Sequence, residues 1–271
     1  VCVHLFPALM LTFIQREAPL PIKTMFIATD YTCSPSVKDS SLDRYFIPAS
    51  SLSGDFLGGG VTSERLRACG IPVRQMFRSS VRKEDAKRAF GIPADHKHLV
   101  MMCGSMGCGP IMSIARRIGR DLPDDQDLTI VCGTNDRLFD RLSRRFYGVK
   151  NVHILSYVKD MALLMDSADL YLTKPGGISV TEAASMRLPM VFIDAVAGCE
   201  EYNKDFFLRT GGAVTGQTPK EIARTSLRLL SDKDALEKMG DALDAAVPHN
   251  AAANILSEMS EAEEEKEEDL A

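Results

Sequence analysis

Short apolar runs alternate with longer amphipathic segments over most of the chain. From residue 97 onward the apolar runs, each of the length of a buried strand, are 98–103, 128–132, 152–155, 169–173, 190–193 and 213–215. The segments with helical apolar spacing between them are 110–120, 136–147, 160–167, 179–186 and 200–210. This alternation predicts βα units on a parallel sheet. Six strands with helices between them make a complete doubly wound α/β domain.

The first 78 residues carry a looser version of the same alternation. Its expected elements are a helix near 8–16 and strands at 22–28, at 45–47 and near 65–69. These strands are too few for a second complete domain, and the chain opens in what reads as the end of a strand. We therefore expect the beginning of this domain to be missing. Proline and glycine at 70–77 and 91–93 indicate an interdomain hinge. The predicted division is 1–78, 79–245 and, as a C-terminal helix with an acidic tail, 246–271.

Charge and cysteine content exclude several classes of protein. The net charge is −5, but residues 258–269 hold eight acids and one lysine, so the rest of the chain is close to neutral and mildly basic. A nucleic-acid-binding protein needs a stronger basic excess, so no nucleic acid is expected as a partner. Seven cysteines without a C-x-x-C pair indicate neither a disulfide framework nor a zinc site, and they are typical of a cytoplasmic protein. The apolar run 5–14 is too short to span a membrane.

The histidine spacing shows no metal-binding pattern, and no metal is expected. His96 and His98 flank the start of a predicted strand, and we expect both to face solvent. Basic side chains on predicted helices read as solvated faces or, less often, as surfaces attracted to anionic lipid headgroups; they are Lys83, Lys87, Arg88, Arg116, Arg117 and Arg120.

Three glycine-rich or polar segments follow predicted strands. The first contains Gly104, Ser105, Met106, Gly107 and Gly109, with the spacing G-x-x-G-x-G. Such a loop lets backbone N–H groups approach a phosphate, and the helix that follows adds positive charge at its start. The spacing is not the dinucleotide fingerprint G-x-G-x-x-G. A phosphate site and a plain tight turn therefore stay equally open.

The second segment, 173–184, contains Gly176 and Gly177 and also opens a helix. Ser179 and Glu182 have the spacing of a capping box, in which the serine caps the helix and the glutamate bonds back to the cap. In the functional interpretation, the Glu182 carboxylate accepts hydrogen bonds from both ribose hydroxyls while the glycine turn faces a diphosphate.

The third segment, 195–203, places Glu200, Glu201 and Asn203 after a strand. Ligands of open parallel sheets bind at that edge, so these side chains could hold sugar hydroxyls. A solvated helix start that favours acids would have the same composition.

In this order, the segments resemble family-28 GT-B glycosyltransferases, above all monogalactosyldiacylglycerol synthases and processive diacylglycerol glucosyltransferases. The motifs that carry the resemblance are ATDYTCSP at 28–35, DRYFIP at 43–48, GIPV at 70–73, TKPGGISVTE at 173–182 and GCEEYN at 198–203. It implies a GT-B fold, with two Rossmann-like domains, a cleft between them, and the first domain incomplete.

The resemblance also implies roles for residues of the donor domain. Glu182 would bind the ribose of a UDP-sugar, Tyr157 and Val158 would hold uracil through their backbone, and Glu200 and Asn203 would grip the hexose. Cys199 departs from the family, which usually has glutamine there. The donor-binding residues assigned in this way are Gly104, Ser105, Met106, Gly107, Gly133, Tyr157, Val158, Lys174, Pro175, Gly176, Gly177, Ile178, Ser179, Glu182, Cys199, Glu200 and Asn203.

On the acceptor side, the candidates for catalysis are Asp30 and His4. The family's glycine-rich loop ending in a histidine has no counterpart in this chain. His4 resembles a later His-Pro-Phe segment, where a structural role is at least as plausible. Asp30 is the carboxylate best placed for acceptor binding or proton transfer, and its alternative is a hydrogen bond at the end of a strand.

The implied reaction is an inverting, metal-independent transfer of a hexose from a UDP-sugar to diacylglycerol. The expected partners are a UDP-hexose, diacylglycerol or a related lipid, and an anionic membrane surface. The UDP-sugar is the substrate and no cofactor is expected. The protein would be cytoplasmic and peripherally associated with the membrane. A UDP-sugar epimerase, a UDP-N-acetylglucosamine transferase of the cell-wall lipid type, and an inactive truncated member of the family stay open as alternatives.

Overall fold

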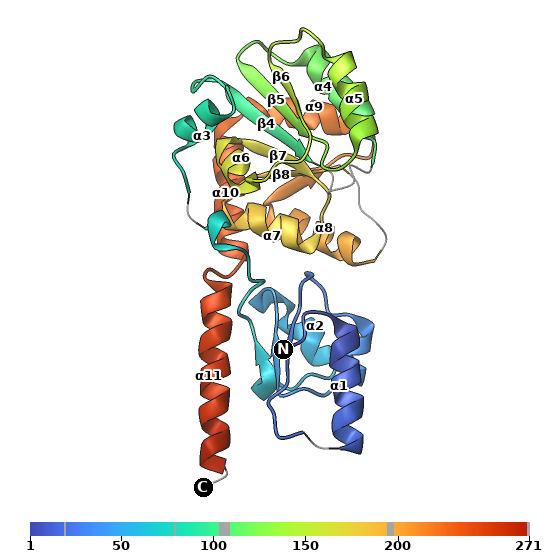
Figure 1. Cartoon of the computed structure of the whole chain (residues 1–271), viewed down its shortest axis with the longest axis vertical. Coiled ribbons are helices and arrows are strands. Elements are labelled where there is room, and N and C mark those ends of the chain that lie inside the picture. Colours follow the sequence, from blue (N-terminus) through green and yellow to red (C-terminus); the bar gives the residue numbers. More distant parts are fainter. Residues whose placement is uncertain (19, 79, 103–108, 194–197, 270–271) are drawn as a thin grey trace. The chain divides into compact units, whose positions relative to one another are not determined.

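The computed structural model describes residues 1–18, 20–78, 80–102, 109–193 and 198–269, with side chains described as far as residue 261. Contacts divide the chain into two units, which Figure 1 shows coloured along the sequence. The first unit joins Val1–Val73 to Ala246–Ala271, and the second is Arg74–Ala245. This division places the boundary at 73/74 rather than 78/79, and it assigns the C-terminal residues to the first unit.

The first unit contains a small parallel sheet. Its strands are β1 (Met25–Ile27), β2 (Arg44–Phe46) and β3 (Leu66–Arg67), paired in the order β1-β2-β3. Cys2 forms a parallel bridge with Phe26 on the free edge of β1, as expected for the end of a strand. The remaining elements before residue 74 are α1 (Leu5–Glu17), η1 (Pro35–Asp39), η2 (Ser50–Leu52), α2 (Ser53–Gly58) and η3 (Ser63–Arg65).

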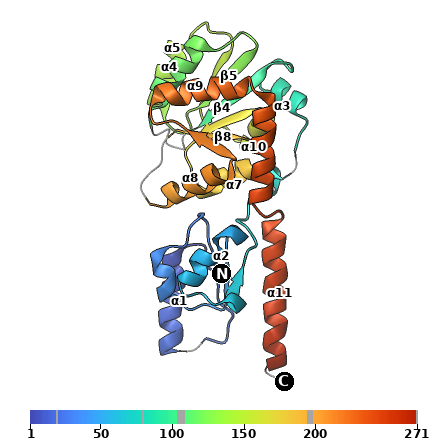
Figure 2. The ribbon, with the colours of Figure 1, turned by 180° about the vertical axis from the view of Figure 1, so that it is seen from behind.

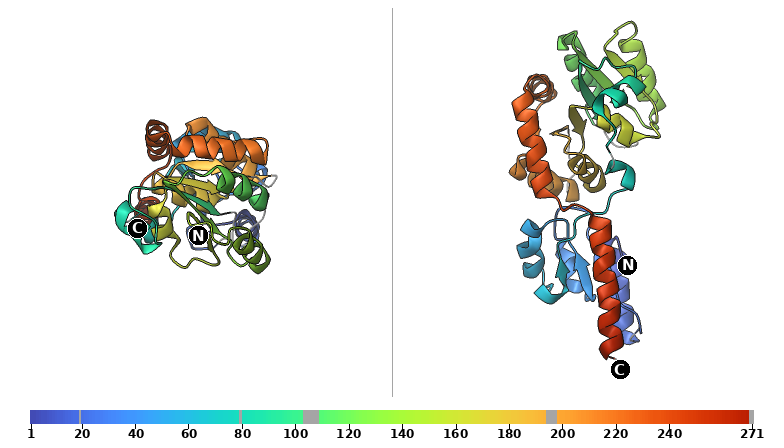
Figure 3. Two further views of the ribbon diagram at one scale, coloured as in Figure 1. Left: turned by 90° about the horizontal axis from the view of Figure 1, so that it is seen from above. Right: turned by 90° about the vertical axis from the view of Figure 1, so that its left-hand side faces the viewer.

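The helix α11 (Ala251–Asp269) completes this unit (Figure 3). Ile255 of α11 is buried with Met25, Ile27 and Phe46 of the sheet. Glu258 accepts a hydrogen bond from Arg67 at 2.6 Å, so an ion pair joins residues 191 positions apart. The backbone of the acidic tail is helical as far as Asp269.

The second unit is built on a parallel sheet of six strands in the order β6-β5-β4-β7-β8-β9. The strands are β4 (Lys97–Met102), β5 (Gln126–Val131), β6 (Val152–Leu155), β7 (Leu170–Thr173), β8 (Met190–Phe192) and β9 (Ala213–Thr215). All six were predicted from the apolar runs. The central strands are buried on both faces, which is why they read as continuous apolar segments.

Helices cover both faces of this sheet. They are η4 (Gln75–Phe77), α3 (Lys83–Ala89), α4 (Ile111–Asp121), α5 (Asp136–Arg145), α6 (Met161–Ser167), α7 (Gly177–Ser185), α8 (Cys199–Thr210), α9 (Pro219–Leu230) and α10 (Lys233–Ala246). Helices α4 and α9 pack on each other (Figure 2), while α3 packs on α6 and α7 on α8. One apolar cluster joins α4, α5 and α9 to the sheet.

The expectation that His98 faces solvent was wrong. His98 lies on β4, which pairs on both sides, and its side chain is fully buried. Its Nε2 lies 2.7 Å from Thr129 Oγ1 and its Nδ1 lies 3.0 Å from Ser167 Oγ, so both ring nitrogens have partners. Burial lowers the pKa of His98 to about 4, so the ring is neutral near pH 7.

The same amino edge of the sheet holds two buried carboxylates. Asp127 lies between His96 Nδ1 at 2.7 Å and His153 Nε2 at 2.6 Å. Asp169 contacts Lys83 at 3.1 Å and Lys87 at 3.2 Å. Lys87 is therefore a buried partner rather than part of a solvated face.

Candidate functional site

The candidate site lies at the carboxyl edge of the six-stranded sheet. Strand β4 is followed in the chain by β5 and β6 on one side, whereas β7 pairs on its other side and leads to β8 and β9. The connections after β4 and β7 therefore diverge, and ligands of open parallel sheets bind at such a switch point. The turn at 174–176 follows β7 at this point.

Helix α7 begins directly after that turn. Its first residue is Gly177 and its N-cap is Gly176, which makes no side-chain capping hydrogen bond. The predicted capping box of Ser179 and Glu182 was therefore wrong, because the helix begins two residues before Ser179. A Cβ atom at Gly176 would meet no atom within 4 Å, so the turn is open on that side. The first N–H groups of α7 are left without a side-chain cap, an arrangement that favours an anion.

Glu182 lies further along α7, with 15% of its side chain exposed. Its Oε1 lies 3.5 Å from Arg74 Nη2, and the Arg74 guanidinium in turn lies 5.0 Å from the centre of the Phe77 ring. Burial raises the pKa of Glu182, and the positive charge of Arg74 offsets part of that effect. The carboxylate therefore pairs with another element instead of capping its own helix.

Helix α8 brings two further candidates to the same turn. Glu200 Oε1 lies 3.0 Å from Lys174 Nζ, with about a fifth of each side chain exposed. Asn203 is fully buried, and its Nδ2 donates a hydrogen bond to the carbonyl oxygen of Pro175 at 3.0 Å. Lys174, Pro175, Glu200 and Asn203, far apart in the sequence, are thus brought together, and Asn203 holds the turn in place.

The other predicted donor residues lie elsewhere on this edge. Gly133 follows β5 and has φ +61°, a value that favours glycine. Tyr157 and Val158 follow β6, and the Tyr157 side chain is 70% exposed. Ile178 and Cys199 are exposed at the starts of α7 and α8. The loop candidates Gly104, Ser105, Met106 and Gly107 lie outside the described residues.

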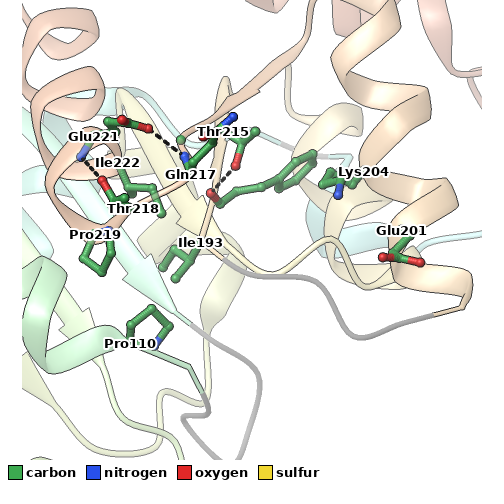
Figure 4. A pocket seen from close by; sticks show the side chains of 12 residues that line it. Pro110, Ile193, Glu201, Lys204, Thr215, Gln217, Thr218, Pro219, Glu221 and Ile222 are labelled. Atoms are coloured by element: carbon green, nitrogen blue, oxygen red, sulfur yellow. Dashed lines mark hydrogen bonds between the residues drawn. The ribbon is translucent and has the colours of Figure 1, made fainter.

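A pocket of about 810 Å³ opens beside these residues, between the ends of β8 and β9 and the starts of α4 and α9 (Figure 4). Its polar lining includes Glu201, which was a candidate, and Lys204, which was not. Thr218 accepts a hydrogen bond from Glu221 N at 3.2 Å, and the Glu221 carboxylate accepts one from Gln217 N at 2.9 Å. The T-x-x-E spacing at 218–221 is the signal that could have located this helix start and its pocket.

The acceptor-side candidates lie in the first unit. His4 is the N-cap of α1, and its Nδ1 accepts a hydrogen bond from Phe6 N at 3.2 Å. Its ring stacks on the Phe6 ring with centroids 5.4 Å apart. This geometry supports the structural role. Asp30 follows β1, and its carbonyl oxygen accepts a hydrogen bond from Thr32 N at 2.9 Å in a tight turn.

Within the described residues, no group of three or more His, Cys, Asp or Glu side chains is arranged to hold a metal ion. None of the described helices is both long enough and apolar enough to cross a membrane.

Two family models match the chain. Residues 1–73 match monogalactosyldiacylglycerol (MGDG) synthase, and residues 115–244 match glycosyl transferases group 1. The second match includes the turn at 174–176, helix α7 and helix α8. The first covers the small sheet with Asp30.

Among curated proteins, the chain is similar to the processive diacylglycerol beta-glucosyltransferase of Staphylococcus saprophyticus. The two are 26% identical over 247 residues, which are 90% of this chain and 63% of that protein. The chain therefore spans less than two thirds of the length of this relative.

Among solved structures, the chain is similar to a putative UDP-N-acetylglucosamine 2-epimerase from Listeria monocytogenes. The TM-score is 0.72 at 18% identity, over 96% of this chain and 72% of that one. It is also similar to MurG of Acinetobacter baumannii, with a TM-score of 0.65 at 16% identity over 92% and 69% of the two chains. Identities this low show a shared fold and not a shared activity, so the epimerase likeness reports architecture.

Together, these findings confirm the α/β GT-B fold class and the resemblance of the chain to GT-B glycosyltransferases of the monogalactosyldiacylglycerol synthase and processive diacylglycerol glucosyltransferase type.

Proposed function

We propose that this protein transfers a hexose from a UDP-hexose to diacylglycerol. The observation that carries the proposal is the start of α7, where N–H groups without a side-chain cap are flanked by Lys174 and Glu182. The names of the matched family and of the curated relative supply the substrate classes.

In this proposal, the start of α7 and Lys174 bind the diphosphate of the donor. The helix dipole and the free N–H groups favour an anion at that place. The partly buried Glu182 carboxylate accepts hydrogen bonds from the two ribose hydroxyls, displacing the long contact with Arg74. Backbone groups of Tyr157 and Val158 hold the uracil.

The sugar would lie near the start of α8. Cys199 is exposed there and Glu200 is partly exposed, while Asn203 acts through Pro175 by holding the turn that contacts the diphosphate. The adjoining pocket of about 810 Å³ is within the range of about 300–1,000 Å³ usual for small-molecule sites.

The reaction would be a direct displacement at the anomeric carbon. The diacylglycerol hydroxyl oxygen forms a bond to that carbon, the bond from the carbon to the β-phosphate oxygen breaks, and UDP leaves with the electron pair. The hydroxyl proton passes to a carboxylate, for which Asp30 is the candidate in this chain. Lys174 and the α7 N–H groups stabilise the charge that develops on the leaving diphosphate. We assign no metal ion and no cofactor to these steps.

Because diacylglycerol resides in a bilayer, we propose that the protein acts while attached peripherally to a membrane surface in the cytoplasm. The match of residues 1–73 to the MGDG synthase family supports acceptor binding by the first unit.

A transfer assay tests the proposal. The purified chain is incubated with vesicles containing diacylglycerol and with radiolabelled UDP-glucose or UDP-galactose in the presence of EDTA, and the lipid fraction is analysed. We expect a labelled glycolipid from the unaltered chain and from Glu237→Ala, which removes an exposed acid on α10. Glu182→Ala should give none. A folded chain that binds UDP but forms no glycolipid from either donor would contradict the transferase proposal.

A further inference from the structure

Four arginines surround one pocket on the outer side of α4. The pocket measures about 530 Å³, and Arg116, Arg117 and Arg120 of α4 line it together with Arg145 at the end of α5. We call this the arginine pocket. Its remaining lining residues, Gly109, Pro110, Met112 and Ser113, carry no charge.

Three of these four guanidinium groups are not neutralised. Arg120 is bound in a two-point contact by Asp121, with both N–O distances at 2.7 Å. Arg116, Arg117 and Arg145 make no ion pair and no hydrogen bond with any residue that the structure describes. The Arg145 guanidinium lies 5.6 Å from the centre of the Phe146 ring, a contact that leaves its N–H donors available.

This composition has a definite chemical preference. Every cation in the lining is arginine, whose planar fork of donors fits two oxygens of a phosphate. Like charges held around one hollow repel one another, and an anion placed among them removes that repulsion. The Ser113 hydroxyl lies in the same lining and can donate a further hydrogen bond. Among the lining residues that the structure describes there is no carboxylate, although Asp136 and Asp140 lie on α5.

We propose that the arginine pocket binds a phosphate group, either of an anionic lipid headgroup or of a free phosphorylated compound. The pocket lies on helices α4 and α5. Its lining includes Gly109 of the first glycine-rich segment, but none of the seventeen residues assigned to donor binding, and Pro110 also lines the pocket of Figure 4. The proposal therefore stands whether or not the chain transfers a sugar.

Tyr147 allows an experiment to distinguish an anionic lipid headgroup from a free phosphorylated compound. It follows Arg145 and Phe146, and its side chain is 91% exposed. Aromatic rings with a polar tip favour the interfacial layer of a bilayer. A lipid headgroup would therefore bring Tyr147 into contact with the membrane, whereas a free phosphate compound would not.

The test compares two double variants that remove equal charge. Arg117→Gln/Arg145→Gln removes two pocket arginines, and Arg224→Gln/Arg228→Gln removes two exposed arginines from the neighbouring helix α9. The probes are glycerol phosphate in solution, and phosphatidylcholine vesicles with or without phosphatidic acid. Calorimetry measures binding of glycerol phosphate, and co-sedimentation measures binding to the vesicles.

We expect the unaltered chain to bind at least one phosphate probe. The pocket variant should lose about tenfold or more in affinity, whereas the α9 variant should change by less than about threefold, since surface charges off the site act only through the general field. If the source is a lipid, Tyr147→Ala weakens vesicle binding and leaves binding of glycerol phosphate unchanged.

Two results would overturn the proposal: absence of binding to both probes, or equal losses in the two double variants. UDP titration of the same proteins shows that they are folded. It also separates failure of the arginine pocket from failure of the donor site, because Lys174 and Glu182 are unchanged in both double variants.

Discussion

Acidification should destabilise the protein through a single buried histidine. His98 is fully buried on β4, and burial lowers its pKa to about 4 from an ordinary value of 6.5, more than its bond to Ser167 and the charges of Asp127 and Asp169 raise it. Above about pH 6.5 the His98 ring is neutral in both the folded and the unfolded chain. Between about pH 6.5 and about pH 4, His98 binds a proton in the unfolded chain but not in the folded chain. The free energy of unfolding therefore falls as the pH falls.

The magnitude follows from the two pKa values. Their difference corresponds to a loss of about 3 kcal/mol when the pH has fallen below about 4. That is a large fraction of the 5–15 kcal/mol typical of folded domains, so the loss is measurable. His98→Gln removes the titrating ring and keeps a polar side chain for the partners Thr129 and Ser167.

Urea unfolding at a series of pH values, for the unaltered chain and His98→Gln, measures the effect. The informative quantity is the difference between the two curves, because effects common to both proteins cancel in it. Near pH 7 we expect a lower free energy of unfolding for His98→Gln than for the unaltered chain. This difference in free energy should shrink by about 3 kcal/mol by pH 4. A difference that is constant over this range would refute the assignment of a neutral, buried His98.

Three further predictions concern the turn after β7. Asn203→Ala removes the buried hydrogen bond to Pro175, and we expect the free energy of unfolding to fall by about 1–3 kcal/mol in chemical denaturation. Lys174→Met removes the cation that pairs with Glu200 beside the start of α7. Calorimetry should show about tenfold or more weaker binding of UDP with unchanged binding of uridine, which lacks the diphosphate, and equal losses for both ligands would contradict the role. Because burial raises the pKa of Glu182 above 4.5, UDP affinity should begin to fall at a higher pH than for an ordinary glutamate; a Glu182→Gln variant with the same pH profile would contradict that cause.

Much of the second unit could be predicted from the sequence because its strands are buried on both faces. Such strands read as uninterrupted apolar runs, and the helices between them keep an apolar stripe toward the sheet. The passage from β7 through Gly-Gly into a helix was also predicted, and this turn brings backbone groups to the edge of the sheet.

The wrong predictions concern side chains whose partners lie far away in the sequence. The spacing of Ser179 and Glu182 imitates a capping box, but Glu182 pairs with Arg74, which lies 108 positions earlier in the chain. His98 is polar and near the start of a strand, yet its partners lie 31 and 69 positions away on β5 and α6. Local patterns carry no information about such contacts.

The extent of the first unit also depends on contacts between residues far apart in the sequence. Residues after 245 read as a separate helix and tail, but Ile255 is buried in the core of the small sheet and Glu258 pairs with Arg67. Composition alone would assign an acidic helix to solvent, whereas the burial of Ile255 and the long-range ion pair show where it packs.

A nucleotide site at the start of α7 underlies the proposed transfer, and calorimetric titration with UDP tests it. We expect micromolar binding by the unaltered chain and by Glu237→Ala, and a loss of about tenfold or more in Glu182→Ala, because the carboxylate would no longer accept hydrogen bonds from the ribose. Absence of UDP binding by a chain shown to be folded, or equal binding by Glu182→Ala, would contradict the central claim.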